Sequence, residues 1–246
     1  MAIGALFLAA GLLHADTGKQ PAVLFQGANE AYRAGDYAHA VEAYESLLAQ
    51  GWKKADVYYN LGNAYFKLKR VGPAILNYGR VKQLRPRDWD AAANLAFVRG
   101  GLEYRMEDRR NWYLKTAEAF INFFTREEIV IAMLTAGLFF WMSWTAHLFF
   151  RPQASWGWWQ KLFLALTLVF SFLWLTKEVY ARSGADAVVL KNQAPVRYGP
   201  SYKDQVAFRL PEGIKVRAKK KLSEWSQVAL VNGEEGWMLN EEIGMV

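Results

Sequence analysis

The chain has 246 residues, of which 30 are lysine or arginine and 23 are aspartate or glutamate, giving a formal net charge of +7 at pH 7. It contains no cysteine, which excludes disulfides, thiolate metal ligands and a cysteine nucleophile. The basic excess is mild and mixed with acidic residues along the chain, so a nucleic-acid partner is disfavoured. The length leaves room for two small soluble domains beside any membrane segment.

The first 15 residues, MAIGALFLAAGLLHA, form an apolar stretch of signal-peptide length. The small residue Ala15 stands at a suitable cleavage point, so we interpret residues 1–15 as a signal peptide. No lysine or arginine follows Met1, which is unusual for a signal peptide. An uncleaved N-terminal anchor is therefore the alternative.

Residues 21–110 repeat themselves at a spacing of 34. The segment NLG at residues 60–62 recurs as NLA at residues 94–96, and Tyr44 recurs as Tyr78. This period resembles the tetratricopeptide repeat, whose units are helix pairs that stack into a solenoid. We therefore expect an all-α tetratricopeptide solenoid with two units and a partial third unit that acts as a cap.

A stack of this kind leaves a concave groove lined by the first helix of each unit. The register predicts that seven aromatic or amide residues face it as a partner-binding groove: Phe25, Asn29, Tyr32, Tyr59, Asn63, Phe66 and Phe97. Packing between helices is the alternative for each aromatic residue. Tetratricopeptide domains that clamp C-terminal carboxylates use basic residues where this chain has Phe25, Asp90 and Asn94. An apolar or extended peptide is thus the expected ligand.

The segment that follows the repeats, residues 111–125, is rich in aromatic residues and poor in charge. This composition predicts a helix that lies at a membrane surface. Thr125 and Glu128 have the spacing of a capping box, which predicts the start of the next helix.

Two apolar runs, residues 128–150 and 158–180, are each long enough to cross a bilayer as a helix. Residues 129–150 contain no aspartate, glutamate, lysine or arginine, so they lack the polar stripe of a soluble helix. The sequence therefore predicts a two-helix transmembrane hairpin. Arg151 in the hinge, residues 151–160, and the adjacent Lys161 favour a cytoplasmic hinge with both flanking soluble regions outside.

Residues 185–246 change to short runs of alternating polarity, such as QVAFRL and WSQVALV, separated by turn signals. Five short strands of this kind predict a small all-β barrel. The segments APVRYGPS, LPEG and EWSQVALVNGEEGWM resemble bacterial SH3 domains, which often bind cell-wall peptides or protein segments. The resemblance implies four ligand candidates, for which barrel packing is the alternative in the case of the two tryptophans: Tyr198, Tyr202, Trp225 and Trp237.

The sequence offers little for catalysis. It holds three histidines without metal-ligand spacing, and no nucleophile elbow or phosphate loop. Asp88 and Asp90 look like paired carboxylates, but their place at the start of a repeat helix favours a helix cap. We expect no catalytic residue, no metal and no cofactor, so the chain is not expected to be an enzyme.

The order of leader, tetratricopeptide stack, two spans and SH3-like domain resembles the E-type proteins of the bacterial aerotolerance (Bat) operons. That resemblance implies a protein of the bacterial inner membrane with its N- and C-terminal domains in the periplasm. It also implies partners: membrane-anchored von Willebrand A-domain proteins and a MoxR-type ATPase, in stress or oxygen tolerance. The expected function is a non-enzymatic scaffold, and the alternative is a peptidoglycan (murein) binding accessory protein that acts through the SH3-like domain.

Overall fold

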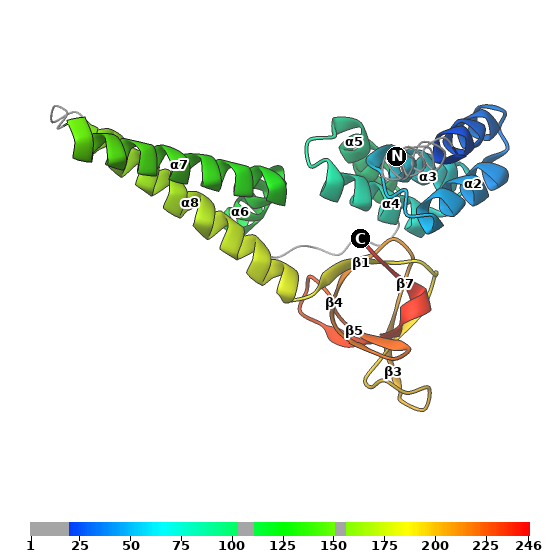
Figure 1. Ribbon diagram of the computed structural model, residues 1–246. Coiled ribbons are helices and arrows are strands. Elements are labelled where there is room, and N and C mark those ends of the chain that lie inside the picture. Colours follow the sequence, from blue (N-terminus) through cyan, green and yellow to red (C-terminus); the bar gives the residue numbers. More distant parts are fainter. Residues whose placement is uncertain (1–19, 103–110, 151–155) are drawn as a thin grey trace, which may run out of the picture. The chain divides into compact units, whose positions relative to one another are not determined.

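The computed structural model describes residues 20–102, 111–150 and 156–246 (Figure 1). It divides into two compact units, one formed by Met1–Glu107 with Asp186–Val246 and the other by Asp108–Ala185. The predicted signal peptide at residues 1–15 and residues 151–155 of the predicted hinge lie outside the described residues.

Helices in the first unit recur at the spacing seen in the sequence. Residues 20–33 are helical, followed by α2 (Tyr37–Ala49), α3 (Ala55–Lys67), α4 (Val71–Leu84) and α5 (Trp89–Gly100). α2 and α4 start at Tyr37 and Val71, which are 34 residues apart. α3 and α5 start at Ala55 and Trp89, which are also 34 residues apart. Consecutive helices from α2 to α5 pack against one another. We call the helices from residue 20 to α5 the helical stack.

The turn that ends the first helix of each pair also recurs. Gly35 (φ 83°) and Lys69 (φ 61°) are 34 residues apart and both adopt the left-handed conformation. The N–H of Gly35 donates to the Tyr32 carbonyl at 3.1 Å, and that of Lys69 donates to the Phe66 carbonyl at 3.0 Å. This is part of a Schellman motif, which usually ends in glycine. The second unit therefore forms the same turn with Lys69 in the position where the first unit has glycine.

The close approach of α3 and α4 depends on Gly62. A Cβ atom added at Gly62 would lie 2.9 Å from Cε1 of the Tyr78 ring, closer than such atoms approach. Ala74, also on α4, is fully buried in the same core. Small residues at these positions let the two helices of the unit pack closely.

The C-terminal part of the first unit is a seven-stranded sheet, which we call the β module. Its strands run in the order β3-β2-β6-β5-β4-β1-β7, and the β1–β7, β2–β3, β2–β6, β4–β5 and β5–β6 pairs are antiparallel. The sheet curls around an apolar core that includes Val196, Val228 and Met238 (Figure 1). The strands are β1 (Ala185–Val189), β2 (Ala194–Arg197), β3 (Val206–Leu210), β4 (Lys215–Leu222), β5 (Trp225–Ala229), β6 (Glu235–Leu239) and β7 (Ile243–Met245), with a 3₁₀ helix at Asn240–Glu242 before β7.

The prediction of a closed barrel is wrong, because β3 and β7 form the two edges of an open sheet and do not pair. Met245 on β7 lies opposite Ala187 of β1. Its carbonyl oxygen accepts two hydrogen bonds from the Arg80 guanidinium, at 3.1 and 2.8 Å. The edge of β7 is therefore occupied by a side chain of α4 instead of a closing strand. A register shift between Val196 and Arg197, where β2 meets β3, further disturbs the opposite edge.

One face of α4 carries the contact between the helical stack and the β module. A Cβ added at Gly72 would lie 2.7 Å from the Val189 carbonyl oxygen, and one added at Gly79 would lie 3.1 Å from Cγ1 of Val246. Leu76 meets Gly244 on the same face. Val188 belongs to the same buried cluster as the stack. We call this contact the docking interface.

Polar groups also join the docking interface. The Glu212 side chain accepts a bond of 3.3 Å from the N–H of Val71, at the start of α4, where backbone N–H groups lack helical partners. Burial lowers the pKa of the Arg80 guanidinium, which also lies 5.4 Å from the Tyr58 ring centroid. The first unit is thus one body in which helices and sheet share a core.

The second unit consists of α6 (Trp112–Phe123), α7 (Arg126–Phe150) and α8 (Trp156–Arg182). α7 and α8 form an antiparallel hairpin, in which the Phe139 and Phe163 rings stack at 5.4 Å and Gln160 donates to the Ser143 carbonyl at 3.2 Å. Judged by length and apolar composition, both helices could cross a membrane, over Arg126–Phe149 and Gly157–Arg182.

The start of α7 confirms the predicted capping box. The Thr125 hydroxyl accepts from the Glu128 N–H at 3.1 Å, and the Glu128 carboxylate accepts from the Thr125 N–H at 2.9 Å. Two N–H groups at the helix start are thereby satisfied by side chains only three residues apart.

Candidate functional site

The helical stack contains two adjoining hollows on the side formed by residues 20–33, α3 and α5. We call them together the groove. The larger has a volume of about 450 Å³ and is lined by Phe25, Asn29, Tyr32, Arg33, Tyr44, Asp56, Tyr59 and Asn60. The smaller, of about 200 Å³, is lined by Tyr32, Asn63, Phe66, Lys67, Tyr78, Asn94, Phe97 and Val98. Tyr32 lines both hollows, and all seven residues that the register predicts at a groove line one or the other.

Each hollow has an asparagine at the centre of a hydrogen-bond network. In the larger one, the Asn29 side-chain oxygen accepts from the Tyr44 hydroxyl at 2.6 Å and from the Asn60 amide at 2.8 Å. In the smaller one, the Asn63 oxygen accepts from the Tyr78 hydroxyl at 2.7 Å and from the Asn94 amide at 3.2 Å. The second network is the first one moved along the chain by 34 residues.

These bonds define what the asparagines contribute. The oxygen of each central asparagine already accepts two bonds from the protein, so its remaining polar function is the NH₂ group, which can donate two. Burial raises the pKa of the Tyr44 phenol to about 12, and it also raises the pKa of Tyr78. Both tyrosines therefore stay protonated and keep donating at neutral pH. The floor of the groove therefore consists of neutral polar groups, the asparagine amides and the tyrosine hydroxyls, which lie between aromatic side chains.

Four residues of these networks were missing from the seven predicted at the groove: Tyr44, Asn60, Tyr78 and Asn94. The sequence contains the signal that identifies them, because both the tyrosine pair and the asparagine pair are spaced by 34. The rings of Tyr44 and Tyr78 are fully buried. Their hydroxyl groups nevertheless reach the groove.

Asn63→Ala is expected to destabilise the stack by about 1–3 kcal/mol, because it leaves the hydroxyl of the buried Tyr78 without its acceptor. The matched control is the double variant Asn63→Ala, Tyr78→Phe, which removes both partners and should lose clearly less than the sum of the two single changes. Thermal unfolding of the full chain in detergent, followed by circular dichroism, measures this. Additive losses would show that the hydrogen bond contributes nothing.

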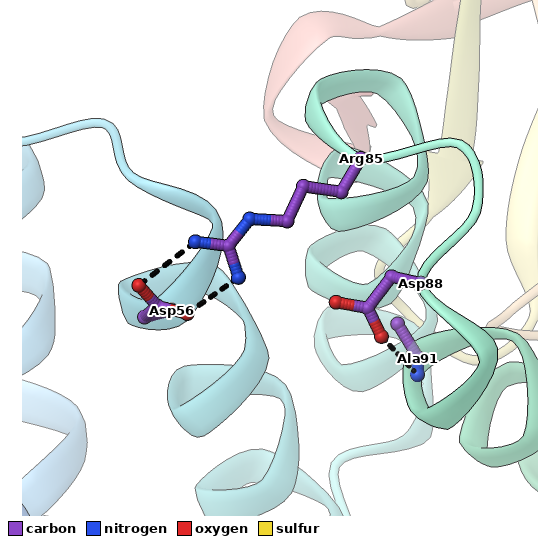
Figure 2. A network of polar contacts seen from close by, with 4 residues as sticks. All are labelled: Asp56, Arg85, Asp88 and Ala91. Carbon is purple, nitrogen blue, oxygen red and sulfur yellow. Dashed lines mark hydrogen bonds and ion pairs between the residues drawn. The ribbon is translucent and has the colours of Figure 1, made fainter. Parts of the chain in front are cut away.

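The rim of the larger hollow carries an ion pair. The Arg85 guanidinium at the end of α4 donates to both Asp56 oxygens, at 2.7 and 3.0 Å, and lowers the pKa of that carboxyl (Figure 2). Both side chains are about half exposed, so water and salt screen the pair and its effect on stability is small. Its role is to pair Asp56, the acidic residue among those that line the two hollows, with a basic neighbour.

Asp88 caps a helix, as the sequence predicts. Its carboxylate accepts from the Ala91 N–H at 2.9 Å at the start of α5 (Figure 2). Within residues 20–102, 111–150 and 156–246, no group of three or more histidine, cysteine, aspartate or glutamate residues is arranged to hold a metal ion.

The four aromatic candidates of the β module fall into two kinds. Tyr198 and Tyr202 are 72% and 63% exposed, whereas Trp225 is only 7% exposed and Trp237 is partly buried. The Tyr202 and Trp225 rings pack edge to face, with centroids 5.2 Å apart. Tyr198 and Tyr202 are therefore accessible to a ligand, and the buried Trp225 packs against Tyr202.

Comparison of the chain with protein-family models gives no match, and comparison with curated proteins also gives none. The groove and the two apolar helices are the features of the molecule that bear on its function.

Proposed function

We propose that this protein is a membrane-anchored, non-enzymatic scaffold that holds a protein segment in the groove of a tetratricopeptide stack. The observation that carries the proposal is the groove, where two equivalent asparagine-centred networks lie between aromatic side chains. α7 and α8 supply the anchor, and the β module is proposed to be an opened variant of the bacterial SH3 domain.

The tetratricopeptide assignment is supported at three levels that share one period. Residue identities, helix starts and the left-handed turns at Gly35 and Lys69 all recur after 34 residues. A solenoid in which each unit packs on its neighbours produces such agreement, because each unit must bury the same face.

The groove suits an extended, uncharged protein segment with an apolar side chain. Phe97 is 71% exposed, and its ring meets the Phe66 ring edge to face at 5.9 Å, so the two present flat apolar area. The asparagine NH₂ groups beside them can donate to peptide carbonyls. We propose that the segment belongs to a membrane-anchored von Willebrand A-domain protein that assembles with a MoxR-type ATPase, as in the Bat systems.

The double variant Phe66→Ala, Phe97→Ala should weaken partner capture about thirtyfold, since loss of a buried aromatic anchor costs about 2 kcal/mol of binding free energy. The measurement is co-purification of A-domain proteins and the MoxR-type ATPase with the full chain from detergent extracts. Trp89→Ala is the matched control, because Trp89 is an exposed aromatic residue of the same stack that lines neither hollow. Equal capture by the double variant and the control would remove the groove from the proposal.

For the membrane orientation we propose that both termini lie in the periplasm. Alkaline phosphatase, which is active only after export, should be active when fused after Val246 and inactive when fused at Ser155. The reason is the basic hinge, which positive-inside behaviour retains in the cytoplasm. The reverse pattern would invert the topology.

The rival function, murein binding through the β module, is supported by the exposure of Tyr198 and Tyr202. Sedimentation of the full chain with purified murein sacculi separates the two proposals. Binding that is lost in Tyr198→Ala, Tyr202→Ala and kept in Phe66→Ala, Phe97→Ala would favour the rival.

A further inference from the structure

Helix α6, Trp112–Phe123, has no buried residue. Five of its large apolar side chains are exposed, although soluble helices of this length normally bury such residues: Trp112, Tyr113, Leu114, Phe120 and Phe123. A helix of this composition favours an apolar environment, and the residues that the structure describes do not bury these five side chains.

Four of the five exposed apolar residues of α6 are gathered on one side, and Leu114 lies outside this group. With about 100° of rotation per residue, Trp112, Phe123, Phe120 and Tyr113 fall within an arc of about 100°. Lys115, Glu118 and Asn122 lie outside this arc, at about 240° to 300° from Trp112, and Thr116 is the one polar residue within it. The helix therefore has an aromatic face and a polar face that run along its whole length.

The position of α6 within its unit is fixed by its neighbours. α7 begins at Arg126, three residues after α6 ends. The Lys177 ammonium group of α8 donates to the carbonyl oxygen of Phe124, immediately after α6. α6 thus joins the hairpin at the end where α7 begins (Figure 1). The last turns of α8, which carry Lys177, Glu178 and Arg182, are at the same end. Charged residues such as these lie at the lipid headgroups when a helix crosses a bilayer.

We propose that α6 is a lipid-docking helix, lying along the periplasmic membrane surface with its aromatic face in the headgroup and upper acyl region. The occupant of the exposed face is then the bilayer that α7 and α8 cross. Tryptophan and tyrosine favour this layer, because an apolar ring with a polar group suits its mixed polarity. The inference rests on the proposed membrane anchor.

The absence of cysteine allows a direct test, because a single introduced cysteine takes a nitroxide label at one known place. The full chain is labelled at Phe120→Cys or Tyr113→Cys on the aromatic face, or at Asn122→Cys on the polar face as the matched control. Each is reconstituted in vesicles of phosphatidylethanolamine and phosphatidylglycerol. Collisions of the label with oxygen, which concentrates in lipid, and with a water-soluble nickel chelate are measured by electron paramagnetic resonance.

Labels at positions 120 and 113 should collide more with oxygen than with nickel, and the label at position 122 should show the reverse. Nickel collisions dominating at all three positions would place α6 in water and overturn the inference. Immobile labels with few collisions of either kind would mean that protein covers the face, which also overturns it.

A label at Leu134→Cys, an exposed position near the middle of α7, separates this result from the membrane anchor itself. Oxygen dominance at position 134 with nickel dominance at positions 113 and 120 refutes the docking of α6 alone. Nickel dominance at position 134 refutes the anchor and the docking together.

Discussion

Gly62→Leu is expected to destabilise the helical stack by roughly 3 kcal/mol or more, because even the first carbon of the new side chain would overlap the Tyr78 ring. The ring is fully buried in a cluster that also contains Leu61 of α3 and Leu95 of α5, so the overlap can be relieved only by pushing the ring toward the smaller hollow or by separating α3 from α4. Thermal unfolding of the full chain in detergent should show an early loss of helical signal from the stack, while α7 and α8 keep theirs.

The control for this prediction is Gly27→Leu, which places the same side chain on a helix of the same stack. A Cβ at Gly27 meets no atom within 4 Å, so nothing has to shift. Leucine is the better helix former, and the variant should be unchanged or more stable by up to about 1 kcal/mol. Similar losses at both glycines would show that the packing against Tyr78 is not the cause.

Gly72→Ala should loosen the β module from the stack. The added methyl group would lie 2.7 Å from a backbone carbonyl oxygen, that of Val189, and 3.2 Å from Cα of Leu190. Backbone atoms cannot turn aside as a side-chain end can, so α4 and β1 must separate. We expect a loss of about 1–3 kcal/mol.

The form of the unfolding curve distinguishes this prediction from ordinary destabilisation. In the unaltered chain the stack and the β module share a core and should unfold in one transition. In Gly72→Ala the two should unfold separately, with the β module first. Arg80→Met, which removes both bonds to the Met245 carbonyl, should give the same separation without adding bulk at Gly72. A single transition in both variants would show that the docking interface does not couple the two parts.

The features that the sequence predicts correctly are local or periodic. The capping box of Thr125 and Glu128 and the cap at Asp88 join residues three positions apart, so spacing alone identifies them. The helix starts follow from the 34-residue period, because a repeated unit must place its helices at repeated positions.

The features that could not be predicted depend on contacts between distant segments. Gly72, Leu76 and Gly79 look like ordinary small and apolar positions of a repeat, and only the fold shows that they meet β1 and β7. The bond from Arg80 to Met245 joins residues 165 positions apart. The open sheet could not be predicted for the same reason. The pattern of each strand is compatible with a closed barrel, and only the fold shows that Arg80 of α4 bonds to the edge of β7.

The docking interface has a consequence for how the groove responds to its ligand. α4 contacts the β module through Gly72, Leu76 and Arg80, and it also supplies Tyr78 to the network around Asn63. If release of the β module lowers the affinity of the groove by some factor, thermodynamic reciprocity requires that a bound segment strengthen docking by the same factor. A ligand of either module would then be an allosteric effector of the other, and occupancy of the groove could be read out as altered ligand affinity at Tyr198 and Tyr202.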